Sequence, residues 1–337
     1  MDISTDFREL CKTVVTDLQL GPLEAISEIK ALAGGVSSDI AMLTIGEQRV
    51  CIKCALAQLK VQAVWKAPVR RNLAEYRWLS FVGSLFPDAV PHLLGRSEAA
   101  SGFAMAYIDP ASAANYKDSL LAREPDAGRA GQVGRLLAAI HAASTQADFD
   151  RSRFDNADDF HALRVEPYLL HTASAHPEVA DQLQALSAAL DAARIALIHG
   201  DVSPKNILYA STGPIFLDAE CASFGDPAFD LAFFLNHLVL KAVHMPDQAN
   251  TLRAAAADCW QHYQSGITWE SPAALEARVS ALLPALALAR VDGKSPAEYL
   301  SPAAGEQIRA RSLQCIASGA SSLLPTIEQL THAEASR

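Results

Sequence analysis

The sequence has little of several residue types, and each scarcity argues against a class of protein. Only 6 of its 337 residues are cysteines, and they are scattered, which is typical of a reducing compartment rather than a disulfide-stapled domain. No run of 18 uncharged apolar residues occurs, so a membrane-spanning helix is not expected. Lys and Arg number 28 against 38 Asp and Glu, and this net charge of −10 argues against a partner such as duplex nucleic acid.

The first ten residues, MDISTDFREL, are acidic where a secretory signal would be basic and then apolar, so we expect a cytoplasmic protein. Cys51 and Cys54 form a Cys-x-x-Cys pair, but no second pair or nearby His cluster accompanies it. Because the pair lies in a strand-like run, its two thiols should face opposite sides of a sheet. We therefore interpret the pair as unrelated to metal binding.

What the sequence does contain is typical of a globular enzyme. Hydrophobic residues make up 50% and charged residues 20%, and the length suits about two domains or two lobes. In the first part, the patterns predict helices over residues 5–20 and 69–82. They predict strands over residues 25–32, 39–45, 49–55, 93–97 and 102–108.

Beyond residue 108, alanine and leucine dominate. Helices are predicted over residues 129–144, 158–173, 177–193 and from 227 onward, with one β-rich interruption over 195–217. The expected fold class is therefore α+β. A small antiparallel-sheet lobe over residues 1–107 would precede a larger, mainly helical lobe over 108–337.

Polar side chains lie at the ends of three short apolar runs in the β-rich interruption. His199 and Asp201 end the first run, Asn206 precedes the second, and Asp218 and Glu220 follow the third. Carboxylate and amide oxygens of this kind suit Mg²⁺, and a further carboxylate can accept a proton from an attacking hydroxyl. Together they are the groups that phosphoryl transfer requires.

These motifs resemble those of the aminoglycoside phosphotransferase and choline kinase family, distant relatives of the protein kinases. The catalytic loop HGDVSPKN spans residues 199–206, the run GDPAFDLA spans 225–232, and the upstream helix pattern GRLLAAIH spans 134–141. The resemblance implies a two-lobed, protein-kinase-like fold. It also implies a kinase that uses ATP and Mg²⁺ to phosphorylate a hydroxyl group of a small molecule.

The resemblance also implies roles for single residues. Asp201 matches the catalytic aspartate, and Asn206 and Asp218 match the Mg²⁺ ligands. Glu220 would join the metal shell or face the acceptor, and His199 would support the loop.

Two further aspartates lie just downstream. Asp230 matches a residue that holds the backbone of the catalytic loop. For Asp226, and also for Asp230, helix capping beside Pro227 is the alternative interpretation.

The nucleotide would bind in the first lobe. Lys53 matches the strand lysine that contacts the ATP phosphates, and Glu75 matches its helix partner. Met105, Ala106 and Ile108 match the segment that lies against adenine and bonds to it through backbone groups. The alternatives are a solvated strand-end lysine for Lys53 and plain core packing for Met105.

The loop over residues 33–39 is similar to the serine-containing phosphate loops of the family. Its backbone N–H groups and the hydroxyls of Ser37 and Ser38 would cap the phosphates. The alternative is a simple Gly-Gly hairpin turn.

Only 12 residues separate Asp218 from Asp230, which leaves no room for the segment that docks peptides in protein kinases. We therefore expect a small-molecule acceptor, with a pocket walled by His237, Trp260, Tyr263 and Arg290. Arg290 and Lys294 favour an acidic or phosphorylated acceptor, whereas Asp292 and the overall charge favour a cationic one. A solvated helix end is the alternative for this region.

A function from a different class is a non-catalytic nucleotide-binding regulatory module of the same fold. The joint presence of the proposed phosphate-binding, metal-binding and catalytic residues argues against it. We expect a monomer or a homodimer without nucleic-acid or membrane partners.

Overall fold

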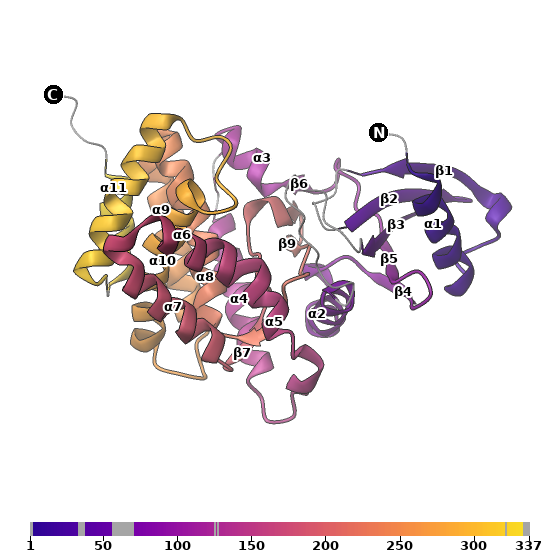
Figure 1. Cartoon of the computed structure of the whole chain (residues 1–337). Coiled ribbons are helices and arrows are strands. Elements are labelled where there is room, and N and C mark those ends of the chain that lie inside the picture. The colour runs from indigo at the N-terminus through magenta and orange to yellow at the C-terminus, as the bar shows by residue number, and fades with distance from the viewer. Residues whose placement is uncertain are drawn as a thin grey trace. The chain divides into compact units, whose positions relative to one another are not determined.

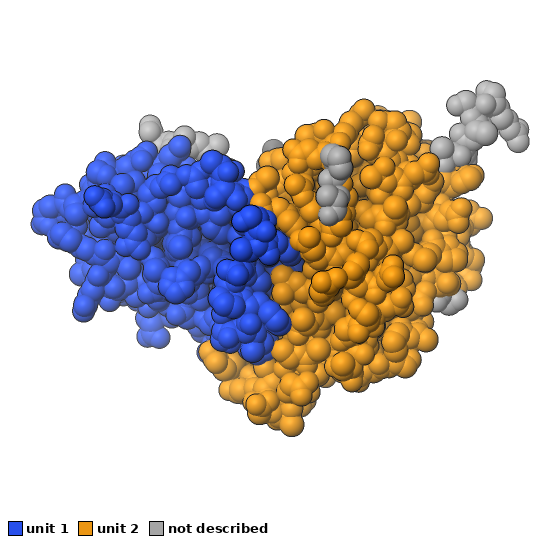
Figure 2. All heavy atoms as spheres, turned by 180° about the vertical axis from the view of Figure 1, so that it is seen from behind, with its two compact units in different colours: residues 1–113, 210–220 blue, residues 114–209, 221–337 orange. Residues whose placement is uncertain are grey.

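A computed structural model of the chain describes residues 3–32, 38–55, 71–124, 126, 128–320 and 322–332. The chain forms two compact units: unit 1 is Met1–Ala113 with Ala210–Glu220, and unit 2 is Ala114–Tyr209 with Cys221–Arg337 (Figure 2). Residues 108–113 and 210–220 thus group with the sheet-containing unit, unlike in the expected division at 107/108. Strand β9 (Gly213–Phe216) accounts for part of the second segment, because buried Phe216 packs edge-on against Trp78, with ring centroids 6.0 Å apart.

Unit 1 contains a five-stranded antiparallel sheet in the order β1-β2-β3-β5-β4. Its strands are β1 (Ile26–Ala31), β2 (Ser38–Ile45), β3 (Gln48–Ala55), β4 (Leu93–Ser97) and β5 (Gly102–Ala106). The expected strands of this sheet are confirmed. Gly46, with φ of 60°, supplies the left-handed residue that the tight β2–β3 turn requires.

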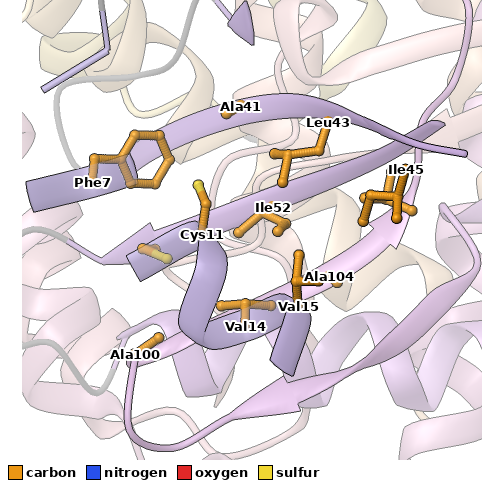
Figure 3. Close-up of a cluster of buried hydrophobic side chains, with 12 residues drawn as sticks. Phe7, Cys11, Val14, Val15, Ala41, Leu43, Ile45, Ile52, Ala100 and Ala104 are labelled. Carbon is orange, nitrogen blue, oxygen red and sulfur yellow. The ribbon is translucent and has the colours of Figure 1, made fainter. Parts of the chain in front are cut away.

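Helix α1 (Thr5–Asp17) covers one face of this sheet (Figure 1). Its apolar side chains recur at helical spacing, and Figure 3 shows them directed at the sheet. This buried cluster includes Phe7, Cys11, Val14 and Val15 from the helix and Ala41, Leu43, Ile45, Val50, Ile52, Cys54 and Ala104 from the sheet. Since side chains alternate along a strand, Cys51 and Lys53 of β3 must point to the other face.

Helix α2 (Arg71–Leu85) lies on that other face. Tyr76 packs on Phe103 of β5, with ring centroids 5.7 Å apart, and Glu75 contacts Lys53. The alternation along β3 therefore separates an apolar core under α1 from a charged cluster under α2. All six cysteines are buried and none forms a disulfide, and Cys51 and Cys54 lie on opposite faces as expected.

Unit 2 is mainly helical. Its longer helices are α4 (Arg129–Ser144), α7 (Ala180–Ala192), α8 (Pro227–His244), α9 (Ala249–Gln264), α10 (Pro272–Asp292), α11 (Pro302–Ser318) and α12 (Leu323–Thr331). Shorter elements are α3 (Tyr116–Leu121), α5 (Ala157–Phe160) and α6 (His171–Ala175). The short strands are β6 (Ala114–Asn115), β7 (Ala196–Ile198), β8 (Ile207–Ala210) and β10 (Ser223–Gly225). They pair as β6 with β8 and β7 with β10.

The helix expected over 158–173 is interrupted. A π-helical segment, η4 (His161–Leu170), lies between α5 and α6 and contains Pro167. Proline has no N–H to donate and its ring crowds the carbonyl one turn earlier, so a widened turn accommodates it within a continuous helical path.

Helices α8 and α10 form the centre of unit 2, and every residue of α8 from Pro227 to Val243 is buried. Among the described residues, α10 alone is long and apolar enough to pass as a membrane span, but 61% of that window is buried inside the protein. A helix that is apolar all round is also what the core of a large domain requires.

Candidate active site

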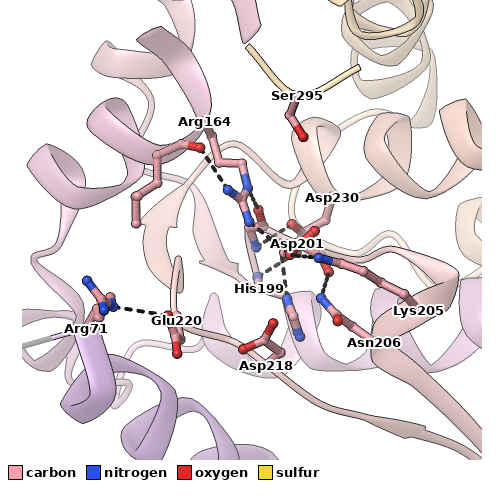
Figure 4. A network of polar contacts seen from close by, with 12 residues as sticks. Arg71, Arg164, His199, Asp201, Lys205, Asn206, Asp218, Glu220, Asp230 and Ser295 are labelled. Atoms are coloured by element: carbon pink, nitrogen blue, oxygen red, sulfur yellow. Dashed lines mark hydrogen bonds and ion pairs between the residues drawn. The ribbon is translucent and has the colours of Figure 1, made fainter. Parts of the chain in front are cut away.

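One lysine and three carboxylates meet on the α2 side of the sheet in unit 1. Lys53 Nζ lies 2.7 Å from Glu75 Oε2, 2.6 Å from Asp218 Oδ1 and 3.0 Å from Glu220 Oε1. We call these four residues the lysine–carboxylate cluster. Arg71, at the start of α2, adds a second cation, with its Nε 3.1 Å from Glu220 Oε2 (Figure 4).

Burial and mutual charge set the protonation of this cluster. Burial opposes the charged form of Lys53, but Asp218, Glu220 and Glu75 outweigh it and hold its pKa well above the usual value. Burial raises the pKa of Glu75 to about 8; Lys53 lowers it, and the negative charges of Asp218 and Glu220 raise it further. While Glu75 keeps its proton, the two other carboxylates balance the two cations, and the cluster gains a surplus negative charge only when Glu75 ionises.

The grouping of three carboxylates fits a divalent cation, which would favour the ionised form of Glu75. The ligand oxygens of Glu75, Asp218 and Glu220 lie within 4.8 Å of one another, and Asp218 retains 27% side-chain exposure. Asp218 also adopts a left-handed backbone conformation, with φ of 65°. Such strain at a non-glycine residue persists where the surroundings hold the side chain in a particular direction, and carboxylate oxygens are the ligands that Mg²⁺ prefers.

The other residues expected to bind the nucleotide have varied surroundings. Ser38 is buried and donates its hydroxyl to Glu220, so it supports the cluster rather than presenting a free hydroxyl to a phosphate. Ser37 and most of the expected phosphate loop lie outside the described residues.

The segment expected to contact adenine is the end of β5. Met105 pairs in register with Cys51, and Ala106 donates its N–H to the His92 carbonyl at 2.8 Å. The Ala106 N–H is thus already paired and is not free to bond to a base. The Ile108 N–H has no backbone acceptor among the described residues.

The catalytic loop lies in unit 2, directly after β7. Asp230, near the start of α8, accepts hydrogen bonds from the His199 N–H at 2.6 Å and the Gly200 N–H at 2.8 Å. Gly200 has φ of 76°, and a Cβ there would lie 2.6 Å from the Cys221 carbonyl oxygen. Glycine is therefore required for this turn, and Asp230 anchors it as the resemblance implies.

Asp201 is held among cations and backbone groups (Figure 4). Its Oδ2 lies 3.0 Å from Arg164 Nη2 and 3.5 Å from Lys205 Nζ, while its N–H donates to His199 Nδ1 at 3.1 Å. Asn206 Nδ2 donates to the Asp201 carbonyl at 3.1 Å. This bond uses Nδ2, and Asn206 Oδ1 accepts no hydrogen bond in the described part of the chain. An amide oxygen without a donor can bind a cation.

The packing of α4 explains two residues of the GRLLAAIH pattern, Gly134 and His141. His141 Nδ1 lies 2.7 Å from the Tyr263 hydroxyl, and His141 Nε2 lies 3.3 Å from Asp230 Oδ2. At Gly134, a Cβ would lie 2.3 Å from the Cys259 carbonyl oxygen, so α4 and α9 approach closely only because this residue is glycine. The pattern thus supports Asp230 from behind.

Two residues expected to wall the acceptor pocket lie elsewhere. Tyr263 is fully buried behind Asp230, and Trp260 stacks against it with 5% exposure. Both belong to the core of unit 2, because α9 presents this face to α4 and α8 rather than to a pocket.

Asp226 confirms the capping alternative. Its Oδ1 accepts from the Ala228 N–H at 2.9 Å, and Arg278 pairs with its carboxylate at 2.8 Å. His237 lies in the middle of α8 and Arg290 at the end of α10, where Arg290 Nη1 donates to the Ser295 hydroxyl at 2.8 Å.

Sequence reasoning missed Arg71 and Arg164. Arg71 precedes the expected Glu75 by one helical turn, a spacing that would have suggested it. Arg164 lies 37 residues before Asp201, and no local pattern marks it. Only the packing of η4 against the catalytic loop brings its guanidinium to Asp201.

A family model described as "Phosphotransferase enzyme family" matches residues 28–275. A search of curated proteins gives no match.

Among solved structures, the chain is similar to a choline/ethanolamine kinase family protein from Mesorhizobium loti. The identity is 16% and the TM-score 0.55, over 96% of this chain and 100% of that one. It is also similar to APH(2″)-IIa in its gentamicin complex. There the identity is 15% and the TM-score 0.51, over 99% of this chain and 98% of that one. A third similar structure is the amicoumacin kinase hAmiN in complex with AMP-PNP, Ca²⁺ and Ami. Its identity is 14% and its TM-score 0.54, over 92% of this chain and 96% of that one. At these identities the likeness shows the fold, which is the expected protein-kinase-like one.

Proposed function

Because the chain belongs to the phosphotransferase enzyme family and is a small-molecule kinase, we propose that it transfers the γ-phosphate of ATP to a hydroxyl group, using Mg²⁺. The observation that carries the proposal is the placement of Asp201. This buried carboxylate is held by Arg164 on a loop that Asp230 anchors through two backbone hydrogen bonds.

Asp201 orients the acceptor hydroxyl and takes its proton as the oxygen bonds to the γ-phosphorus and the bond to the leaving ADP oxygen breaks. Arg164 and Lys205 hold the carboxylate in one direction before the acceptor arrives, and this reduces the ordering needed at the reaction step.

Lys53 supplies positive charge to the phosphates, and Glu75 fixes its direction. Asp218 and Asn206 are the proposed Mg²⁺ ligands, with Glu220 beside Asp218 in the lysine–carboxylate cluster. When bound, Mg²⁺ would neutralise charge that develops on the transferred phosphoryl group.

We also propose a small-molecule acceptor, a cytoplasmic location and no nucleic-acid or membrane partner. The net charge of −10 and the short stretch between Asp218 and Asp230 support these proposals. A regulatory nucleotide-binding module remains the competing function, and it predicts ATP binding without transfer.

The test is phosphate transfer from ATP across a panel of hydroxyl metabolites and aminoglycosides, with product mass as the readout. We expect a phosphorylated product with the wild type. Asp201→Asn should lower kcat on the order of 10²–10⁴-fold while ATP affinity is retained.

Asp181→Asn, an exposed carboxylate on α7, is the matched control and should behave as wild type. Near wild-type turnover in Asp201→Asn would remove Asp201 from its role. ATP binding without product or hydrolysis would favour the module.

A further inference from the structure

Lys241 is a buried cation without a counter-charge. It lies on α8 with 1% exposure, and its Nζ lies 5.2 Å from the centroid of the Tyr299 ring. No carboxylate among the described residues pairs with it. Burying an unpaired ammonium group is costly, so a lysine in this position calls for an explanation.

The charges around Lys241 are also positive. Burial, together with the charges of Lys117 of α3 and Arg290 of α10, lowers its pKa to about 7. His244 of α8 also contacts Tyr299, with ring centroids 5.1 Å apart. Burial, followed by Lys241 and Arg290, likewise holds the pKa of His237 well below its usual value.

Two acidic side chains of the neighbouring segments are paired with other groups. Asp292 lies 2.7 Å from Arg309 and 2.8 Å from His176. Glu166 lies 2.7 Å from Lys294. None of the ion pairs among the described residues includes Lys241, Arg290 or His237.

Two further hydrogen-bonding groups of this region lack partners. The Tyr299 hydroxyl and the Arg290 Nε are buried, and neither has a hydrogen-bond partner among the described residues. Lys241 lies against the Tyr299 ring, and the charge of Arg290 lowers the pKa of both groups. An anion would supply acceptor atoms to the Lys241 ammonium, the Tyr299 hydroxyl and Arg290 Nε.

One face of α8 connects this neighbourhood to the catalytic loop. Arg164, which pairs with Asp201, places its guanidinium 5.8 Å from the centroid of the Phe233 ring. Phe233 contacts His237 with ring centroids 5.3 Å apart, and Lys241 follows one turn later. From Phe233 to Lys241 the helix rises about 12 Å, a length that a small metabolite spans.

We propose that the acceptor carries an anionic group, a phosphate monoester or a carboxylate, which Lys241, Arg290 and the Tyr299 hydroxyl bind while its hydroxyl faces Asp201. This inference rests on the proposed function, because it names the acceptor class of that reaction. It decides between the acidic and the cationic acceptor in favour of the acidic one.

The first experiment tests the anion site without catalysis. Sulfate is the probe, because it keeps its two negative charges near neutral pH. In the presence of AMP-PNP and Mg²⁺, sulfate should raise the melting temperature of the wild type. The effect should be larger at about pH 6 than at about pH 8.5, since protonated Lys241 binds the anion and its pKa is about 7.

Lys241→Met keeps a similar volume and removes the charge. We expect it to melt higher than wild type without sulfate and to lose the sulfate effect. Lys12→Met, at an exposed lysine paired with Glu9 on α1, is the matched control and should keep the sulfate effect. An equal sulfate effect in Lys241→Met and wild type would overturn the proposal. A lower melting temperature of Lys241→Met without sulfate would instead identify Lys241 as a structural contact of Tyr299.

The second experiment compares acceptors that differ in one group: glycerol, glycerate and glycerol 3-phosphate. We expect transfer to one or both anionic compounds at least tenfold faster than to glycerol, with the two anions distinguishing phosphate from carboxylate. Lys241→Met should raise the KM for the anionic acceptor about tenfold or more while the KM for ATP is unchanged.

The two proposals fail in different ways. Transfer only to neutral or cationic acceptors, unaffected by Lys241→Met, would overturn the anionic acceptor and leave the kinase proposal standing. Sulfate binding through Lys241 without transfer to any acceptor would support the anion site and count against the proposed reaction.

Discussion

At the scale of single residues, Lys53 shows how alternation along a strand creates a charged cluster. Its neighbours Ile52 and Cys54 face the apolar core under α1, so Lys53 faces α2 and meets Glu75. A buried ion pair of this kind contributes little net stability, because desolvation offsets most of the attraction. The contact with Glu75 instead holds the Lys53 side chain in one direction.

Glu75 should make the stability of the protein depend on pH. Its pKa of about 8 in the folded state lies above the ordinary value of 4.5, so the folded protein retains a proton that the unfolded chain releases. This contribution to stability is therefore lost as pH rises from about 4.5 to about 8. The melting temperature in the absence of Mg²⁺ should fall between about pH 6 and pH 8.5.

Glu75→Gln, which cannot ionise, should show a smaller fall over the same interval. Glu98→Gln, an exposed carboxylate of unit 1, should retain the full fall. Identical pH dependence in Glu75→Gln and the wild type would contradict the raised pKa.

At the scale of elements, η4 determines where Arg164 points. Its Nε donates to the Gly200 carbonyl at 2.6 Å while Nη2 contacts Asp201, so one planar side chain holds both the turn and the carboxylate. A lysine offers a single point charge in place of this fork.

Arg164→Lys should therefore lower kcat by roughly tenfold with an unchanged KM for ATP, because one of the two contacts is lost. Steady-state kinetics at saturating acceptor provide the measurement. An exposed arginine, Arg123, which pairs with Asp247 on the surface, offers the matched Arg123→Lys control. If the loss in the free energy of unfolding equalled the loss in transition-state stabilisation calculated from kcat, Arg164 would be a structural residue only.

The contact between α4 and α9 gives a prediction on stability. In Gly134→Ala, the new Cβ would meet the Cys259 carbonyl oxygen, and a backbone atom cannot turn aside as a side chain can. We expect a loss of about 1–3 kcal/mol in the free energy of unfolding, despite alanine's better helix propensity.

Urea unfolding is the measurement for this pair of helices. Gly305→Ala on α11 is the control, because its Cβ would meet only Val291 Cγ1, at 3.6 Å. It should be neutral or stabilising. An equal free energy of unfolding in the two variants would show that α4 and α9 can move apart without destabilising the protein.

At the scale of the whole molecule, the proposed function assigns one Mg²⁺ ligand to each unit, and the dependence of the rate on Mg²⁺ tests each assignment separately. Chelation of divalent cations should abolish transfer, and Mg²⁺ should restore it. Asp218→Ala in unit 1 and Asn206→Ala in unit 2 should each raise the Mg²⁺ concentration for half-maximal rate. An unchanged Mg²⁺ titration in either variant would count against that ligand.

The sequence alone determined the elements and the local motifs. Period-two and helical patterns predicted the five strands of the sheet and the bounds of α4, because these patterns reflect which face each residue buries. The segment from His199 to Asn206 was predictable because one short turn contains all its groups. Pro167 within residues 158–173 was the signal for the π-helical segment that the helical pattern concealed.

Only the tertiary structure decided which distant side chains meet. Alanine suits either face of a helix, so the Ala-rich second part does not reveal that Tyr263 faces the core while Lys241 faces Tyr299. Arg164 reaches Asp201 through packing that no local spacing encodes. Sequence periodicity records burial along one element, whereas the partners of a buried charge depend on elements far along the chain.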